Sequence, residues 1–317
     1  MVAGLALLAA CSSSGGDDAL PGGPTTAAGS ATTVTGVAAT TAPTAATTTT
    51  VPELQAAGET PEEVAAQIVA AERALRAPGA TPDELDRAGR LQQLAYRRLS
   101  SHAEEWDPIV AALAPPDLQG AFTANVAARN AFRSMADDSD TPPSTTLPAW
   151  RIKAPVAAGV LRGYYAEGEA LTGVPWSYLA AIHLVETRMG RIDGLSTAGA
   201  QGPMQFLPST WAGCCQGDID DDHDAIIGAA RYLKQSGAPG DMNRALFRYN
   251  RDTRYVAAIT AYAQNMAADE RAYAGYHAWQ VFFASSAGDV RLPVGYEHPE
   301  PIDAAAYVAA HPEDVER

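Results

Sequence analysis

The stretch PWSYLAAIHLVETRMG, from Pro175 to Gly190, reads as a helix that carries one acid within an apolar sequence. Proline at the first position and glycine at the last are typical limits of a helix. At 100° per residue, Glu186 lies in the middle of one face, which it shares with Leu179, Ile182, His183 and Met189. The opposite face holds Ser177, Ala181 and Arg188. The helix therefore places a carboxyl group among apolar side chains.

Burial would change the chemistry of Glu186. An ionised carboxylate is costly among apolar neighbours, so burial should raise the pKa of this group and keep it protonated. The alternative is a structural role, in which Glu186 pairs with a nearby cation, either Arg191 or His183. A lone glutamate on an apolar face is compatible with both interpretations.

A second segment, TAGAQGPMQFLPSTW from Thr197 to Trp211, bends too often for a core element. Gly199 and Gly202 allow the chain to turn or to approach a ligand closely. A helix that begins near Pro203 would present free N–H groups at its N-terminus. We expect these groups, together with Gln205, to bind a polar ligand such as a sugar amide.

A third segment, LFRYNRDTRYV from Leu246 to Val256, closes a short helix with the pair Tyr249 and Asn250. A tyrosine ring has a flat face that suits a sugar ring, and an asparagine amide can bind an acetamido group. This pair is therefore a second candidate for contact with a sugar.

The three segments together resemble the soluble lytic transglycosylase family. The resemblance lies between about Pro175 and Met266, and its motifs are Glu186-Thr187 on a helix, Ser196 with GAQGPMQ soon after it, and RYN farther along. It implies a goose-type-lysozyme-like helical fold that cleaves bacterial peptidoglycan with no cofactor and no metal. It implies Glu186 as the catalytic acid and base, and a glycan site made by Ser196, Gly202, Met204, Gln205, Tyr249 and Asn250. The chain departs from the usual family pattern in having threonine at 187 and proline at 203.

The resemblance also implies a lyase reaction that uses one acid twice. Glu186 would protonate the oxygen between N-acetylmuramic acid and N-acetylglucosamine, and then accept the proton of the muramoyl 6-hydroxyl as the ring closes to a 1,6-anhydro product. Most glycosidases need a second carboxylate, and the only nearby acid in sequence is Asp193. Two other functions remain open, namely a hydrolytic muramidase on the same fold and a non-catalytic peptidoglycan-binding or scaffold protein.

The N-terminus predicts export to the cell envelope. Residues 2–10 are apolar but too few to span a bilayer, and LAAC, from Leu8 to Cys11, resembles the lipobox of a bacterial lipoprotein signal. The thiol of Cys11 would then carry lipid; the alternative is a chance cysteine in an apolar N-terminus. The segment from Thr25 to Thr50 has 12 threonines and no charged residue, which is typical of a disordered tether. We expect an extracytoplasmic protein, lipid-anchored to the membrane and facing the cell wall.

Charge and cysteine content exclude several classes of protein. The formal net charge of −15 argues against a nucleic-acid partner. Besides Cys11 the chain has only the neighbours Cys214 and Cys215, which could form a vicinal disulfide or remain free. Two adjacent cysteines cannot staple distant parts of the chain, and they are too few for a zinc site.

Two further segments have structural interpretations. GDIDDDHD, from Gly217 to Asp224, has the alternating acids of a calcium loop, but His223 stands where glycine is needed and Ala229 where the final glutamate is needed. We favour a solvated loop that caps the following helix. The tail from Gln280 to Ile302 predicts a short hairpin or an extended arm.

The sequence before the site predicts more helices. Thr60-Pro61-Glu62-Glu63 and Thr81-Pro82-Asp83-Glu84 each begin a helix with a capping residue, a proline and an acid. An apolar run at helical spacing extends from Leu118 to Phe132. The expected fold class is all-α, with a lysozyme-like catalytic domain, an additional N-terminal helical region used for packing or spacing, and a disordered tether. In chain order we expect a lipoprotein signal (1–11), the tether (12–53), the helical region (54–136), a linker (137–150), the transglycosylase domain (151–276) and a C-terminal extension (277–317).

Overall fold

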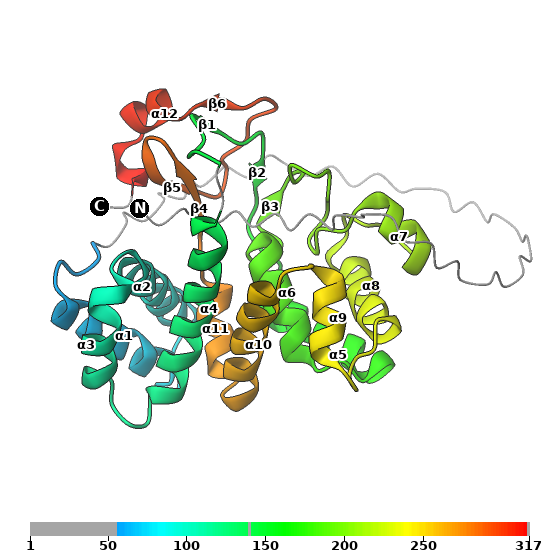
Figure 1. Ribbon diagram of the computed structural model, residues 1–317, viewed down its shortest axis with the longest axis horizontal. Helices are drawn as coiled ribbons and strands as arrows, with labels where there is room; N and C mark the ends of the chain where they lie inside the picture. The colour runs from blue at the N-terminus through cyan, green and yellow to red at the C-terminus, as the bar shows by residue number, and fades with distance from the viewer. Residues whose placement is uncertain (1–55, 139–140, 316–317) are drawn as a thin grey trace, which may run out of the picture. The chain divides into compact units, whose positions relative to one another are not determined.

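The computed structural model describes residues 56–138 and 141–315, which belong to one compact unit (Figure 1). The expected lipobox with Cys11 and the expected tether lie outside the described residues. Among the described residues, no helix combines the length and the hydropathy that a bilayer crossing needs. The fold is mostly helical, as the sequence predicts, with three small two-stranded sheets.

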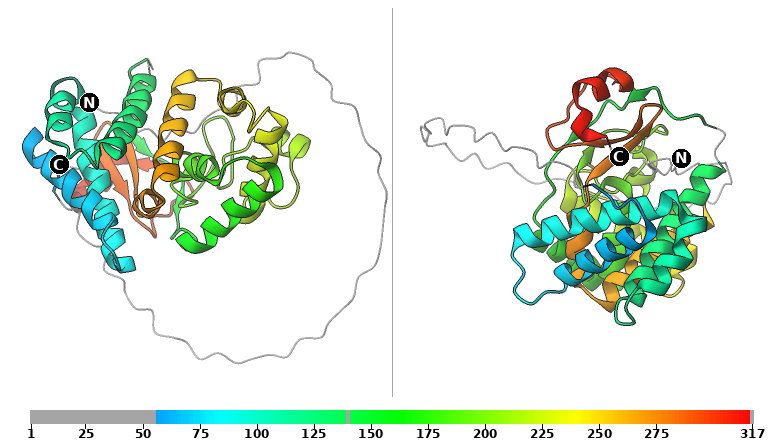
Figure 2. Two further views of the ribbon diagram at one scale, coloured as in Figure 1. Left: turned by 90° about the horizontal axis from the view of Figure 1, so that it is seen from below. Right: turned by 90° about the vertical axis from the view of Figure 1, so that its left-hand side faces the viewer.

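The N-terminal helices begin where the capping patterns place them. Thr60 and Thr81 each accept a hydrogen bond from the backbone of a glutamate three residues later, and that glutamate accepts one in return, so both capping boxes are complete. The sequence analysis did not predict the third of these helices. The four are α1 (Pro61–Leu75), α2 (Pro82–Ser101), α3 (Ala103–Leu113) and α4 (Gln119–Asp137), which lie side by side in Figure 2.

These helices pack against the rest of the chain and do not form a separate spacer. α4 lies along α10 (Thr253–Ala268), and α2 lies against α11 (Arg271–His277). Ala128 of α4 belongs to the same apolar core as Leu179. The approach of α2 to α11 depends on Gly89, because a Cβ there would lie 2.5 Å from the carbonyl oxygen of Gly275.

The helix with Glu186, α6 (Trp176–Thr187), lies in the middle of the helical core. It contacts helices on several sides, and Ser177 and Ala181 are as buried as the face that carries Glu186. A helix that is buried all round needs no polar face, which fits its almost uniformly apolar sequence. Its neighbours are α5 (Ala158–Thr172), α8 (Asp222–Gln235), α10 and α11. Farther from it, α7 (Pro208–Cys214) lies against α8, and α9 (Met242–Tyr249) lies against α8 and α10 (Figure 1).

The short strands join the expected linker to the C-terminal extension. The segment 137–150 is not a simple linker, because it contains a strand and the buried Trp150. The tail forms the hairpin, and Val281 lies opposite Leu292 in it. The pairs are β1 (Thr146–Leu147) with β6 (Ile302–Asp303), β2 (Arg151–Ile152) with β3 (Ile192–Asp193), and β4 (Val281–Ser285) with β5 (Gly288–Leu292); α12 (Ala304–Ala310) follows β6, and a short 3-10 turn (Pro312–Asp314) comes after it.

The contact between α2 and α11 gives a stability test of this docking. Gly89→Ala should lower the free energy of unfolding by about 1–3 kcal/mol, because the added Cβ has backbone and the Ala278 side chain in its way. Gly163→Ala is the matched control, since Gly163 is also within a helix but a Cβ there would have no described neighbour within 4 Å. It should be neutral or stabilising by up to about 1 kcal/mol in denaturant unfolding. Equal effects of the two changes would contradict the packing described.

Candidate functional site

Glu186 is an enclosed carboxyl group with a single hydrogen bond among the described residues. It lies in the last turn of α6, and its side chain is 2% exposed. The Tyr255 hydroxyl donates to Oε1 over 2.7 Å, while Oε2 is buried without a hydrogen-bond partner among the described residues. Burial raises the pKa of Glu186 to about 8, against the opposing effects of the Tyr255 hydrogen bond and the Arg188 charge. The carboxyl is therefore protonated at neutral pH, in the direction that the sequence predicts.

Neither candidate cation pairs with Glu186. Arg191 donates from Nη2 to the carbonyl oxygen of His277. His183 uses Nδ1 for the Tyr165 hydroxyl, 2.8 Å away, and burial lowers the pKa of this imidazole to about 3. The interpretation of Glu186 as one half of an ion pair is therefore wrong for both partners.

The chain leaves α6 through three consecutive left-handed residues. Arg188 and Met189 have φ of 55° and 61°, and Gly190 follows with φ of 77°. Met189 is thus beyond the helix that was expected to include it, although it stays fully buried. Thr187 holds this exit, because its hydroxyl donates to the carbonyl oxygen of Pro203 over 2.6 Å and accepts from the Gly190 N–H. Thr187 therefore ties the end of α6 to the glycine-rich segment.

The glycine-rich segment is a tight loop, and no helix begins at Pro203. The backbones of Gln201 and Phe206 exchange two hydrogen bonds of 3.0 Å, which closes the loop, and α7 begins only at Pro208. Gly202 is required here, because it has φ of 74° and a Cβ would lie 1.9 Å from the carbonyl oxygen of Ile219. The close approach is to the protein's own backbone. The expected row of free N–H groups at Pro203 is therefore not formed.

Three of the expected sugar-binding residues build this loop from within. Ser196 Oγ accepts hydrogen bonds from the Ala198 and Ala200 N–H groups. Gln205 is 2% exposed and donates from Nε2 to the Gly202 carbonyl oxygen, with its Oε1 buried and unpartnered among the described residues. Met204 is fully buried. These side chains shape the loop beside Glu186. Among their polar atoms, Gln205 Oε1 is the one still able to accept a hydrogen bond from a ligand.

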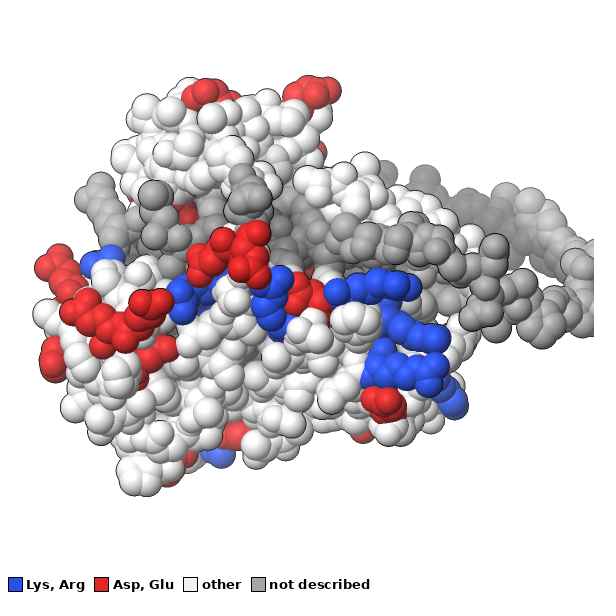
Figure 3. All heavy atoms as spheres, in the orientation of Figure 1, with Lys and Arg blue, Asp and Glu red and all other residues white. Residues whose placement is uncertain are grey.

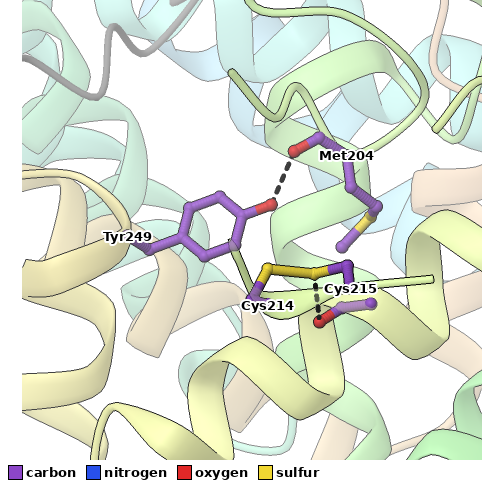
Figure 4. Close-up of a disulfide and its surroundings, with 5 residues drawn as sticks. Met204, Cys214, Cys215 and Tyr249 are labelled. Carbon is purple, nitrogen blue, oxygen red and sulfur yellow. Dashed lines mark hydrogen bonds between the residues drawn. A yellow bond between two sulfur atoms is a disulfide. The ribbon is translucent and has the colours of Figure 1, made fainter. Parts of the chain in front are cut away.

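Tyr249 holds the loop and does not expose a flat face. Its side chain is 2% exposed, and its hydroxyl donates to the carbonyl oxygen of Met204 over 2.5 Å (Figure 4). The ring packs edge-on against Phe206 and Tyr232. The ring therefore has no open face in this structure, and its contact with a sugar stays a prediction. Asn250, the next residue, ends α9 and is 7% exposed.

The two neighbouring cysteines form a disulfide near this loop. Cys214 and Cys215 are bonded to each other, and Cys215 Sγ contacts the Gly228 carbonyl oxygen at 3.5 Å (Figure 4). Both pack partly buried against the core that contains Tyr249. Of the two states that the sequence allowed, the structure has the vicinal disulfide.

Two acidic elements near the site have other functions. Asp193, the only acid close to Glu186 in sequence, is exposed and pairs with Arg151. The acidic segment caps α8, because Asp221 accepts from the Asp224 N–H at the start of that helix. The Asp224 carboxylate in turn accepts from the Asp218 N–H. The helix cap that the sequence predicts in this segment is therefore formed.

Sequence reasoning missed the partner of Glu186. Tyr255 lies 69 residues away on α10, inside the quoted segment LFRYNRDTRYV but six positions after Tyr249. The sequence signal for this partner is a tyrosine at an apolar position of a helix, because a buried tyrosine hydroxyl needs a hydrogen-bond partner. The burial pattern of α10 turns Tyr255 toward α6, which the linear sequence does not show.

Comparisons with known proteins leave the family of the chain open. No protein-family model, no curated protein and no solved structure matches it. The resemblance to soluble lytic transglycosylases therefore depends on the three sequence motifs alone.

The loop geometry predicts unequal effects of alanine at two glycines. Gly202→Ala and Gly199→Ala both place a side chain at a left-handed φ, which costs about 1–2 kcal/mol. Only Gly202→Ala also meets backbone, so its loss of unfolding free energy should exceed that of Gly199→Ala by about 2 kcal/mol or more. Denaturant unfolding measures both, and a larger loss at Gly199 would contradict the loop described.

The buried carboxyl predicts a pH-dependent stability difference. Folding raises the pKa of Glu186 from 4.5 to about 8, so the folded state holds a proton that the unfolded state releases between these values. The contribution of Glu186 to stability is therefore fully present below pH 4.5 and is lost as the pH rises to about 8. Glu186→Gln has no group that must stay protonated. The free energy of unfolding of this variant minus that of the unchanged protein should therefore rise by a few kcal/mol between about pH 5 and 8.

Thermal or denaturant unfolding at several pH values provides the measurement. Glu104→Gln, the same chemical change at an exposed position on α3, is the control and should give a flat difference. A flat difference for Glu186→Gln as well would show that the carboxyl is not held protonated.

Proposed function

We propose that this chain is a peptidoglycan lytic transglycosylase in which Glu186 is the only catalytic carboxyl group. The observation that carries the proposal is the enclosed carboxyl with a pKa raised to about 8, one oxygen bound to Tyr255 and the other buried without a partner among the described residues. A protonated carboxyl with one unused oxygen is suited to donate a proton to a glycosidic oxygen. The order of the three sequence motifs supports peptidoglycan as the substrate, and the helical core supports a lysozyme-like fold.

The chemistry that we propose uses the same group twice. Glu186 donates its proton to the oxygen that leaves with N-acetylglucosamine, and the 2-acetamido group of the muramoyl sugar stabilises C1. The resulting carboxylate accepts the proton of the muramoyl 6-hydroxyl, whose oxygen bonds to C1 and closes the 1,6-anhydro ring. Tyr255 supports the second state, because its hydroxyl donates to the carboxylate and opposes the rise in pKa.

The enclosure of Glu186 has a consequence for substrate entry. Because its side chain is 2% exposed, a glycan reaches the carboxyl only after neighbouring side chains move. The loop 201–206 is the neighbour tied to α6 through Thr187 and to α9 through Tyr249. The same enclosure supplies the desolvation that keeps the acid protonated. Attachment to the membrane through Cys11 remains a prediction from the sequence.

Digestion of purified sacculi tests the reaction. The unchanged protein should release products with 1,6-anhydro ends, seen by mass spectrometry, while Glu186→Gln should abolish release because the amide has no proton to transfer. Activity should fall as the pH rises through about 8, where Glu186 loses that proton.

Glu104→Gln is the matched control and should digest sacculi at the unchanged rate. Reducing ends in place of anhydro ends would replace the transglycosylase with a muramidase that uses the same acid. Substantial digestion by Glu186→Gln would show that Glu186 is not the acid.

A further inference from the structure

Three exposed arginines form a basic patch on an acidic protein. Arg244, Arg248 and Arg251 follow one another at helical spacing along α9 and the turn after it, and Figure 3 shows Lys and Arg side chains gathered over α9. None of the three makes an ion pair with another described residue. In a chain with a formal net charge of −15, three such cations close together mark a place that attracts an anion.

The acids nearest in sequence to the patch are already engaged. Asp252 accepts from Arg254, which also pairs with Asp138. Asp241 caps α9 by accepting from the backbone N–H of Arg244, which leaves the Arg244 guanidinium unpaired among the described residues. The patch therefore keeps its positive charge at the surface.

A groove of about 740 Å³ runs beside the patch, between α9 and α10. Arg244 and Phe247 line it next to the cap residue Asp241. Its α10 side has three apolar residues, Val256, Ala257 and Ala261, and three polar ones, Thr253, Thr260 and Gln264. It extends along α10 from Thr253 to Gln264, which corresponds to about 16 Å at the rise of a helix. That length matches about five residues of extended peptide.

The groove begins beside the turn that carries Asn250, one of the residues predicted to contact sugar. Asn250 and Arg251 form that turn, shortly before Thr253, where the groove starts along α10. α10 presents Tyr255 to Glu186 on its buried face and lines the groove with its other face. One helix therefore connects the proposed acid and the groove.

We propose that the α9–α10 groove binds the short acidic peptide that a peptidoglycan strand carries, and that Arg244, the arginine of the patch that lines the groove, contacts its carboxylates. The inference rests on the proposed function, because it takes the strand bound at Glu186 as the carrier of the peptide. Arginine matches carboxylates with paired N–H groups, and the apolar part of the groove wall, Val256, Ala257 and Ala261, suits small side chains such as alanine. The groove volume fits a ligand of a few residues and is too small for a folded partner.

Equilibrium binding tests the groove without any need for catalysis. The full chain carrying Glu186→Gln is titrated with soluble glycan fragments that bear peptides, with the same fragments after the peptides are removed, and with the free peptide. Peptide-bearing fragments should bind about tenfold more tightly than the peptide-free ones, a difference that one or two charge-assisted hydrogen bonds supply.

Two groove variants and one control separate the effect of the arginine charge, the effect of filling the groove, and the effect of removing any surface arginine. Arg244→Ala should reduce the preference for peptide-bearing fragments to about twofold or less, and Ala257→Trp should do the same by filling the groove. Arg87→Ala removes an exposed arginine on α2, away from the groove, and should keep the full preference. Affinity for the peptide-free fragments should be equal in all of these proteins.

Several outcomes would overturn the inference. If peptide-bearing and peptide-free fragments bind with equal affinity, while the chain that retains Glu186 digests sacculi normally, the groove does not recognise the peptide. The proposed function would be unaffected by that result. Binding of neither fragment, with no digestion, would remove both. Arg244-dependent binding to phosphatidylglycerol vesicles without any preference for peptide-bearing fragments would assign the patch to a membrane surface instead.

Discussion

The burial of α6 from Leu179 to Thr187 is the constraint on which the rest of the structure depends. A helix surrounded on all sides has no exposed face to which a charged side chain can turn, so the carboxyl of Glu186 stays in an apolar setting. Because the carboxyl is protonated, no charge is buried, and the Tyr255 hydroxyl donates a hydrogen bond to one of its oxygens. The same desolvation that makes Glu186 unfavourable as an ion makes it suitable as an acid.

The loop beside Glu186 is held at two places by hydroxyl groups that donate to backbone carbonyls. Thr187 binds Pro203 from the end of α6, and Tyr249 binds Met204 from the end of α9. These contacts hold a loop with a left-handed Gln205, a conformation that a non-glycine residue adopts only when its surroundings impose it. Most of the residues that the sequence predicts to contact sugar, among them Ser196, Met204 and Gln205, thus form the loop beside Glu186.

α10 connects the parts of the fold that the sequence suggested as separate regions. Its inner face contacts α6 and supplies Tyr255, and α4 from the N-terminal helices packs along it. The N-terminal helices therefore support the helix that positions the partner of Glu186. The C-terminal hairpin and the strand at Thr146–Leu147 add a further small core around Trp150, separate from the core within the N-terminal helices. It joins the expected linker to the C-terminal extension.

The sequence by itself determined the elements whose signals are local. The capping boxes at Thr60 and Thr81, the cap at Asp221 and the apolar run around Glu186 each act within one turn or one helix, so the helices and the burial of the acid could be predicted. The tertiary structure alone decided the contacts between distant residues. Tyr255 reaches Glu186 across 69 positions, and the ring of Tyr249 is buried because Phe206 and Tyr232 pack against it. Such partners depend on how helices are placed relative to one another, and a periodic pattern gives the face of a helix without the identity of what covers it.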